Sequence, residues 1–324
     1  AGAMAFLPKP LRRFCCSEDH SAVSQDIVDE TQRGQAPRQF AEEAVPEKLE
    51  DLATAPPAAS DASPPAARDG TIASADVAGS GASPVAVEEL EEEVELPGGL
   101  RYRGQWLNGE RHGKGVLIRP DGQRYEGEFQ NSKAHGQGTF YASNGNRYEG
   151  QWEEDRAHGF GTYTHTDGST YEGEWRHDDK AGQGVEMWAD GAKYWGEFLR
   201  GCKHGSGVYT SGRGVSYEGE FRNDKMHGSG NYKFGDGRAY VGEWSEGHMN
   251  GRGKMEWPNG SSYDGEWAQD MKNGEGTYTW PDGRIYRGQW RQGKQHGRGV
   301  SIDAAGVETP GMWSDGAQLQ PAPA

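Results

Sequence analysis

A tyrosine recurs every 23 residues along most of this chain, nine times without an insertion or a deletion. Aligned on that tyrosine, each repeat reads Tyr, any residue, Gly, Glu or Gln, then Trp or Phe, followed by a polar stretch and a Gly-x-Gly pair. A fixed period of this length indicates an array of one small structural element rather than an ordinary globular core. The nine repeats begin at Tyr102, Tyr125, Tyr148, Tyr171, Tyr194, Tyr217, Tyr240, Tyr263 and Tyr286.

Glycines define how one repeat folds, because they fill the third, twelfth, fourteenth and twenty-first places of every copy. In the third repeat these are Gly150, Gly159, Gly161 and Gly168. A helix does not tolerate so many glycines. Residues 148–152 alternate apolar with polar, which predicts a strand with one buried face. A second strand follows over residues 159–165, and the Asp-Gly pair at 167–168 predicts a tight turn.

A single hairpin of this kind has too little apolar surface to offset the entropy of ordering its backbone. We therefore expect neighbouring hairpins to stack and to share their stability along the array. In this arrangement the rings of one hairpin, such as Tyr148 and Trp152, lie across the glycines of the next hairpin, where no side chain blocks them.

The repeat resembles the MORN repeat, most closely at Tyr171–Trp175 and Met226–Gly230. The resemblance extends from Tyr102 to about Gly316. It implies an all-β fold: an elongated, twisted, single-layer antiparallel sheet of about nine to ten stacked hairpins. It also implies a scaffold of the kind that MORN-repeat proteins form at cytoskeletal, axonemal and membrane-junction sites, although the fold by itself does not specify a task.

Composition divides the chain into three parts. Residues 1–100 contain no Trp or Tyr and carry 19 acidic against 7 basic residues. With the Ala/Pro/Ser tract 53–67, they are predicted to be a disordered acidic tail. Residues 101–308 form the nine repeats, with 31 acidic and 27 basic residues beyond position 100, a balance that does not favour nucleic-acid binding. Residues 309–324 form a degenerate capping repeat and a short tail.

The run Glu88–Glu95 has two interpretations. It is either a short helix or a solvated block of charge, and the block is favoured.

The N-terminus offers a candidate membrane anchor. Cys15 and Cys16 are candidate acylation sites, and Lys9, Arg12 and Arg13 are candidate contacts for lipid headgroups. The alternative is a solvated basic start with incidental cysteines. Ala1–Ala3 precede a plausible initiator, Met4.

The chain contains three cysteines and no run of eighteen apolar residues. Reduced thiols fit a cytoplasmic location, either associated with the cytoskeleton or a cilium, or peripheral on the cytosolic face of a membrane.

No catalytic constellation is apparent, and we expect no enzyme activity, cofactor or metal. The recurring Glu or Gln at the fourth place gives identical environments rather than an acid and a base with different pKa values. The Gly-x-Gly pairs lack the Lys-Ser/Thr of a phosphate loop. A histidine recurs at the eleventh place, and we expect a structural loop hydrogen bond there rather than a metal ladder. These histidines are His112, His135, His158, His204, His227 and His296.

Residues that break the repeat are candidates for partner binding. Trp195 stands where Glu is usual, and Phe160 stands where Lys, Gln, Ser or Arg is usual. Period-two alternation places both on the more polar face, with Tyr141 and Met187 of the same parity. The alternative for Trp195 is local packing against Trp188 or Phe198.

At the C-terminus, Thr309–Trp313 keeps the third and fifth places of the repeat but loses the tyrosine, as expected of a cap. Exposed final strands also invite edge pairing, which predicts a homodimer through the eighth and ninth repeats.

Two functions follow from these observations. The first is a non-catalytic scaffold that binds a helical or extended segment of a protein partner. The second is a membrane-tethering, phospholipid-associated module, or the regulatory MORN region of a truncated phosphatidylinositol phosphate kinase.

Overall fold

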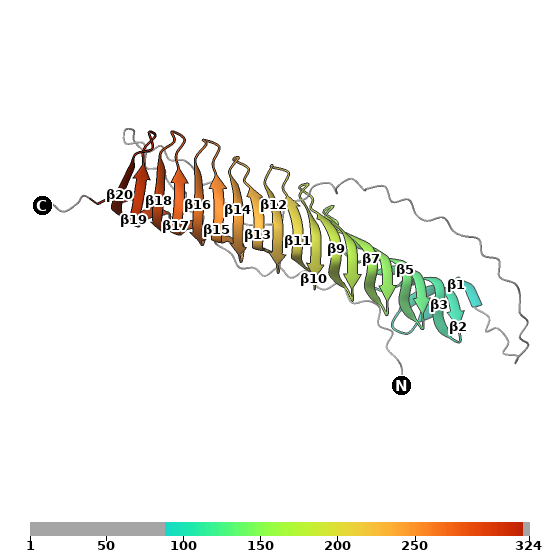
Figure 1. Cartoon of the computed structure of the whole chain (residues 1–324). Coiled ribbons are helices and arrows are strands. Elements are labelled where there is room, and N and C mark those ends of the chain that lie inside the picture. Colours follow the sequence, from blue (N-terminus) through green and yellow to red (C-terminus); the bar gives the residue numbers. More distant parts are fainter. Residues whose placement is uncertain (1–87, 320–324) are drawn as a thin grey trace, which may run out of the picture. The chain divides into compact units, whose positions relative to one another are not determined.

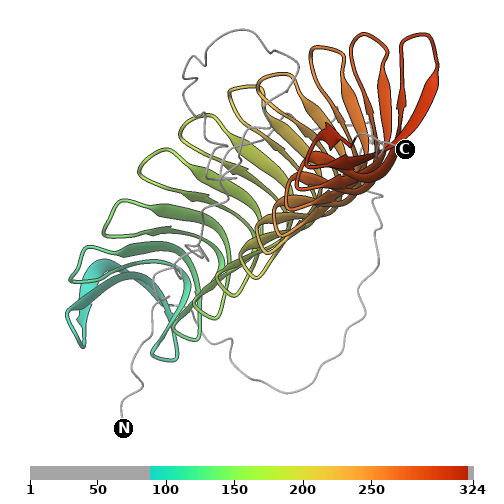
Figure 2. The ribbon, with the colours of Figure 1, turned by 90° about the vertical axis from the view of Figure 1, so that its left-hand side faces the viewer.

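The computed structural model describes residues 88–319, which divide into two units between Thr166 and Asp167. Each unit is a sheet built from consecutive hairpins, and the described residues contain no helix. Within each unit the strands lie side by side in one curved layer (Figures 1 and 2).

The first unit is a meander in which every strand pairs antiparallel with the next. Its strands are β1 (Glu88–Leu96), β2 (Leu100–Leu107), β3 (Glu110–Ile118), β4 (Arg124–Gln130), β5 (Lys133–Tyr141), β6 (Arg147–Glu153) and β7 (Arg156–Thr164).

The second unit repeats the same antiparallel meander from β8 to β21. The predicted all-β, single-layer antiparallel fold of stacked hairpins is therefore confirmed. Its strands are β8 (Thr170–Arg176), β9 (Asp179–Met187), β10 (Lys193–Leu199), β11 (Cys202–Thr210), β12 (Ser216–Arg222), β13 (Lys225–Lys233), β14 (Ala239–Ser245), β15 (His248–Glu256), β16 (Ser262–Ala268), β17 (Met271–Thr279), β18 (Ile285–Arg291), β19 (Lys294–Ile302), β20 (Glu308–Ser314) and β21 (Ala317–Gln318).

Each repeat forms one hairpin, as β6 and β7 illustrate. The two residues between these strands, Glu154 and Asp155, have φ angles of 52° and 66°. Two successive left-handed residues form the tight turn whose twist matches that of the flanking strands. The connection from one repeat to the next is longer. In the loop after β13, the Gly237 N–H donates to the Phe234 carbonyl at 3.0 Å, which places the Asp236-Gly237 pair in a turn as predicted.

The glycines seat the tyrosine of their own hairpin, which corrects the expectation that rings cover the glycines of the next one. A Cβ on Gly161 would lie 2.4 Å from the Tyr148 hydroxyl oxygen, and a Cβ on Gly150 would lie 2.4 Å from the Gly161 Cα. The Tyr148 hydroxyl then donates to the Gln151 carbonyl at 2.9 Å. The ring therefore lies flat over its own two strands, where only glycine leaves room for it.

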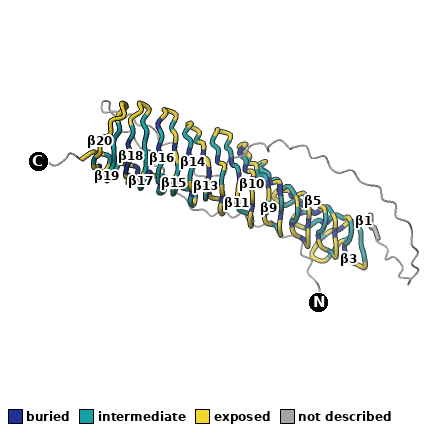
Figure 3. Tube along the Cα trace, in the orientation of Figure 1, coloured by how far each residue is buried: buried dark blue, intermediate teal, exposed yellow. Residues whose placement is uncertain are grey.

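Stacking between repeats comes instead from the ring at the fifth place. Trp152 makes edge-to-face contacts with Tyr148 of its own repeat and with Tyr125 of the preceding repeat, at centroid distances of 5.1 and 5.2 Å. All nine tyrosines of the period are fully buried. Figure 3 shows the buried stretches recurring along the strands, with exposed residues at the connecting turns.

Residues 88–96 form strand β1, which corrects both interpretations of the acidic run and the placement of a disordered tail up to residue 100. β1 pairs with β2, with Val94 opposite Tyr102 and Leu96 opposite Leu100. Val94 and Leu96 are half-buried while Glu95 between them is exposed, which is the period-two pattern of a strand. Pairing covers backbone groups of β2 that an open sheet edge would leave unbonded.

At the other end, Trp313 of β20 is buried and packs against Tyr286 at a centroid distance of 4.9 Å. The short strand β21 pairs only with Trp313 and Ser314.

Candidate interaction site

The sheet of each unit presents two chemically different faces. We call the face that carries the repeat tyrosines the ring face, and the opposite one the outer face. Side chains on the ring face are largely used in packing. A partner site built from exposed side chains is therefore sought first on the outer face.

The Glu or Gln at the fourth place of the repeat has a structural role. Its side-chain oxygen accepts a hydrogen bond from the backbone N–H of the residue at the thirteenth place. The Phe160 N–H donates to Gln151 at 2.7 Å, and the Ser206 N–H donates to Glu197 at 3.0 Å. The sheet has a bulge at this point, where regular pairing is interrupted. These side chains therefore hold the backbone at the bulge between two paired strands.

Trp195 stands at the centre of a cross-strand row on the outer face of the second unit. It lies opposite Val185 of β9 on one side and Val208 of β11 on the other. Val185 in turn faces Glu172 of β8, and Val208 faces Glu218 of β12. Directly opposed residues project from the same face of a sheet. We call these five residues the Trp195 row.

The indole of Trp195 is 38% exposed. Neither residue expected to cover it stands in its row: Phe198 packs against Tyr171 and Tyr194 on the ring face, and Trp188 lies under the Lys203 ammonium. The local-packing alternative for Trp195 is therefore not what the structure shows.

Met187, the next outward residue after Val185 along β9, is also exposed. It extends the apolar surface beside the Trp195 row. Glu172 and Glu218, at the ends of the row, are exposed and make no ion pair with any residue that the structure describes. The surface is thus an apolar centre between two free carboxylates.

The two remaining predicted partner residues lie in the first unit. Phe160 projects from β7 and is 64% exposed, the largest fraction among the exposed apolar side chains. Tyr141 of β5 is only half-exposed, because the guanidinium groups of Arg124 and Arg147 lie 5.5 and 5.7 Å from its ring centroid. These cation–π contacts make Tyr141 a less available aromatic surface than Phe160.

The histidines at the eleventh place lie in strands beside the bulge, not in loops as expected. The Nδ1 atoms of His135, His204 and His227 are buried without a hydrogen-bond partner among the described residues. The backbone carbonyl of His227 does accept a hydrogen bond, which the Tyr217 hydroxyl donates at 3.3 Å. The predicted ring hydrogen bond is therefore not seen at these three atoms, whereas the Nδ1 of His296 accepts the Asp315 N–H at 3.4 Å.

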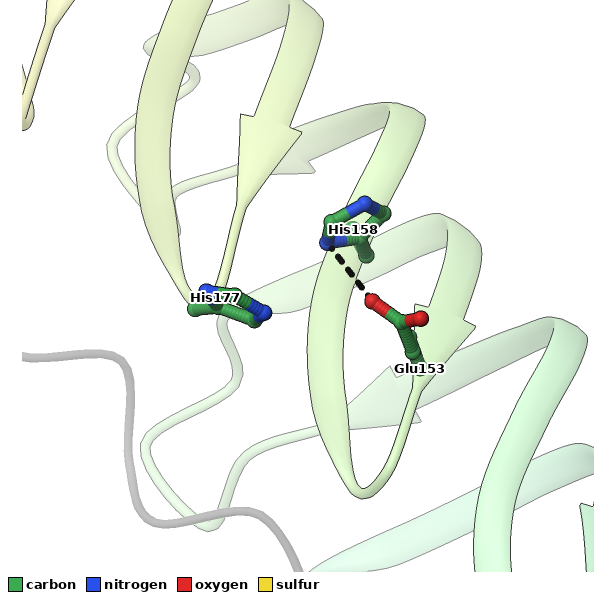
Figure 4. A group of neighbouring side chains, drawn as sticks. All are labelled: Glu153, His158 and His177. Atoms are coloured by element: carbon green, nitrogen blue, oxygen red, sulfur yellow. Dashed lines mark ion pairs between the residues drawn. The ribbon is translucent and has the colours of Figure 1, made fainter.

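His158 differs from these three in having a carboxylate beside it. Its Nδ1 lies 3.2 Å from Oε2 of Glu153 in the same hairpin (Figure 4). His177, drawn in the same figure, belongs to the second unit.

Sequence reasoning missed a set of buried cations at the tenth place of the repeat. Lys180 and Lys203 point into the ring face of the second unit, and both pair with Glu186. Ala or Met stands at this place in the second, third, sixth and seventh repeats. Glu186 replaces the aromatic or aliphatic side chain common at the sixteenth place. In the sequence, charged residues replace the apolar ones at both places. That the two places lie close together is apparent only once the register of the strands is known.

Burial and charge act in opposite directions in this cluster. Burial lowers the pKa of Lys180, and the adjacent Glu186 carboxylate opposes that shift. Burial alone would raise the pKa of Glu186, but the ammonium groups of Lys180 and Lys203 outweigh it and hold that pKa below its usual value. Lys272 is buried in a similar position, 4.3 Å from the ring centroid of Tyr278 and 4.8 Å from that of Trp290.

The candidate acylation and lipid residues lie outside the residues that the structure describes. They are Lys9, Arg12, Arg13, Cys15 and Cys16. The third cysteine, Cys202, is half-buried at the start of β11. Over residues 88–319, no helix is long and apolar enough to cross a membrane.

Fold and site together define a β-repeat protein whose hairpins stack through a ladder of tyrosines with tryptophans or phenylalanines and whose outer face carries exposed apolar side chains. The MORN repeat model matches nine consecutive segments, and the chain belongs to this family. The segments are 102–124, 125–147, 148–170, 171–193, 194–216, 217–237, 240–262, 263–283 and 286–307.

Among curated proteins, no relative matches. Among solved structures, a point mutant of the TCP10 domain of Danio rerio CPAP matches at 12% identity and a TM-score of 0.34, covering 68% of this chain and 99% of that domain. The TCP domain of SAS-4 from Drosophila melanogaster, in complex with a proline-rich motif of Ana2, matches at 10% identity and a TM-score of 0.24, covering 60% and 86%. Likenesses of this size carry no functional argument.

Proposed function

We propose that this protein is a non-catalytic scaffold that binds a protein partner at a cytoskeletal, ciliary or membrane-associated structure. The observation that carries the proposal is the Trp195 row. A large aromatic side chain is held exposed between two valines on a rigid sheet. Such aromatic anchors dominate the binding energy of protein interfaces.

The repeat architecture supports this proposal because it separates stability from recognition. Tyrosines and fifth-place rings fill the ring face, and bonds from the fourth-place Glu or Gln fix the bulges. Outer-face positions such as Trp195 and Phe160 are not needed for either. They are free to vary between repeats and to specify a partner.

The test compares tagged full-length protein with Trp195→Glu and Val241→Glu in its native cells. Val241 is the matched control because it is an exposed apolar residue at the same place of another repeat, with Asn231 and Lys254 opposite it. We expect Trp195→Glu to remove a defined set of co-purified proteins, quantified by mass spectrometry, that Val241→Glu retains. Identical sets for all three proteins would contradict the proposal.

Fractionation of the same cells tests the location. We expect the wild type in a detergent-resistant cytoskeletal pool, and we expect Cys15→Ser/Cys16→Ser to remain there. Movement of the double variant from membranes to the soluble pool would instead support the lipid-tethered alternative.

A further inference from the structure

The Trp195 row has a symmetrical chemical pattern across five strands. Its order is acidic, aliphatic, aromatic, aliphatic, acidic, from Glu172 through Trp195 to Glu218. Four strand spacings of about 4.8 Å separate the two carboxylate positions by about 19 Å. A complementary ligand has one apolar side chain at its centre and one cation on each side.

This chain contains a segment with the complementary pattern. Residues 6–14 read Phe-Leu-Pro-Lys-Pro-Leu-Arg-Arg-Phe, with Leu11 midway between Lys9 and Arg13. In an extended backbone, residues two apart share a face, so these three side chains project together. Prolines on either side of Lys9 favour an extended backbone for a docked segment.

The dimensions agree as well as the charges do. Lys9 and Arg13 are four residues apart, or about 13 Å in an extended chain, and their long side chains span the remaining ~3 Å at each end. From these relations we infer that residues 6–14 dock across strands β8–β12. In this arrangement Leu11 lies on Trp195, and the two cations, Lys9 and Arg13, lie beside the two glutamates, Glu172 and Glu218.

The connection between the segment and the sheet permits this contact. Residues 15–87 lie between the segment and β1, and that length of chain spans more than ~200 Å when fully extended. A covalent tether makes docking intramolecular, so even a weak contact is populated. The docked segment would shield the row from other partners and its basic side chains from anionic lipid.

This inference uses the surface of the proposed function but does not require it to be correct. A partner that binds the row has to displace the segment. If the segment fails to dock while Trp195→Glu still removes a partner, the inference is wrong and the proposed function stands.

The experiment places a photoreactive group in the full-length chain, as Phe14→p-benzoylphenylalanine, and maps its cross-links by mass spectrometry. We expect the main products within peptides of β8–β12, at a yield independent of protein concentration. Trp195→Glu should lower that yield by about tenfold, because it places a third acidic group in the row and removes its apolar centre. Val241→Glu is the control and should leave the yield unchanged.

A charge exchange tests the orientation. Lys9→Glu/Arg13→Glu should abolish the cross-link, and adding Glu172→Lys/Glu218→Lys should restore it. Even labelling of the whole array, or a yield unaffected by Trp195→Glu, would overturn the inference. A yield that rises with protein concentration would also overturn it and would assign the contact to a second copy.

Vesicles containing phosphatidylserine supply a second readout. If the row shields Lys9 and Arg13, Trp195→Glu should increase vesicle binding of the full-length chain over that of the wild type. Equal binding by the two proteins would mean that the segment is not held by the row.

Discussion

The Trp152 indole N–H donates to the carbonyl of Gly138, 3.0 Å away and in the preceding repeat. Trp244 makes the same bond to Gly230, and Trp267 makes it to Gly253. The bond adds a polar link to the ring ladder. Because it requires an indole, repeats with phenylalanine at the fifth place stack without it.

Trp152→Phe removes this bond together with part of the buried ring. The variant keeps a ring between Tyr125 and Tyr148, as Phe129 does in the preceding repeat, so the expected loss of unfolding free energy is about 1–3 kcal/mol. Trp152→Ala removes the ring as well and should cost about 3–5 kcal/mol. Urea denaturation of the wild type, Trp152→Phe and Trp152→Ala measures the two losses of unfolding free energy. Equal losses for Phe and Ala would mean that the ring itself contributes little.

Gly150→Val tests the seat of the tyrosine. The Cβ of the added side chain would lie 2.4 Å from the Gly161 Cα and 2.6 Å from the Phe160 carbonyl oxygen. These are backbone atoms of the paired strand, so they cannot move aside without distorting the sheet. We expect a loss of about 3 kcal/mol or more, measured by thermal denaturation. Gly212→Ala is the control, because a Cβ there meets only the Asp190 carbonyl oxygen at 3.6 Å, an ordinary van der Waals contact. An unchanged melting curve for Gly150→Val would refute the close packing of Tyr148 on its own glycines.

Much of this architecture follows from the sequence because it is local and repeated. The tyrosine period fixes the register, the glycines mark where rings lie, and period-two alternation places Phe160 and Trp195 on the outer face. Strand β1 was not predicted, because a run of glutamates resembles a solvated block until the unpaired edge of β2 is known. Burial of Lys180 was not predicted either, because lysine is usually exposed and only its pairing with Glu186 makes the interior position possible.

The buried Lys180–Glu186–Lys203 cluster should be fragile towards loss of one partner. Glu186→Gln leaves two buried ammonium groups without their shared carboxylate, and we expect a loss of about 3–5 kcal/mol. The triple variant Lys180→Met/Glu186→Tyr/Lys203→Met uses the residues of repeats six and seven at these places. It should be as stable as the wild type or more stable, since desolvated charge is exchanged for packed apolar groups. Urea denaturation distinguishes the two. A triple variant as unstable as Glu186→Gln would show that the charges themselves stabilise the array.

Acid should act on the same cluster. The pKa of Glu186 is lower in the folded protein than its ordinary value of 4.5. Its contribution is therefore fully present above pH 4.5 and is lost as the pH falls through the folded pKa. This part of the acid sensitivity should be absent from Glu186→Gln, and urea midpoints from pH 7 to pH 3 measure it. The same acid loss in both proteins would assign it to other carboxylates.

Asp155 should give the first unit the opposite dependence on pH. Burial raises the pKa of this carboxyl from 3.8 to about 6, although its Oδ1 accepts the Ala134 N–H at 2.7 Å. Between those values the folded protein holds a proton that the unfolded chain has released, so stability falls as the pH rises from about 4 to about 6. Asp155→Asn keeps the acceptor oxygen and removes the charge. We expect this variant to lose that pH dependence and to exceed the wild type by about 2 kcal/mol at pH 7. Asp155→Ala, which also lacks the acceptor, should gain less. Urea midpoints at pH 4, 5, 6 and 7 decide the matter, and a wild type whose stability rises over this range would show that Asp155 is held as a carboxylate by its hydrogen bond to Ala134.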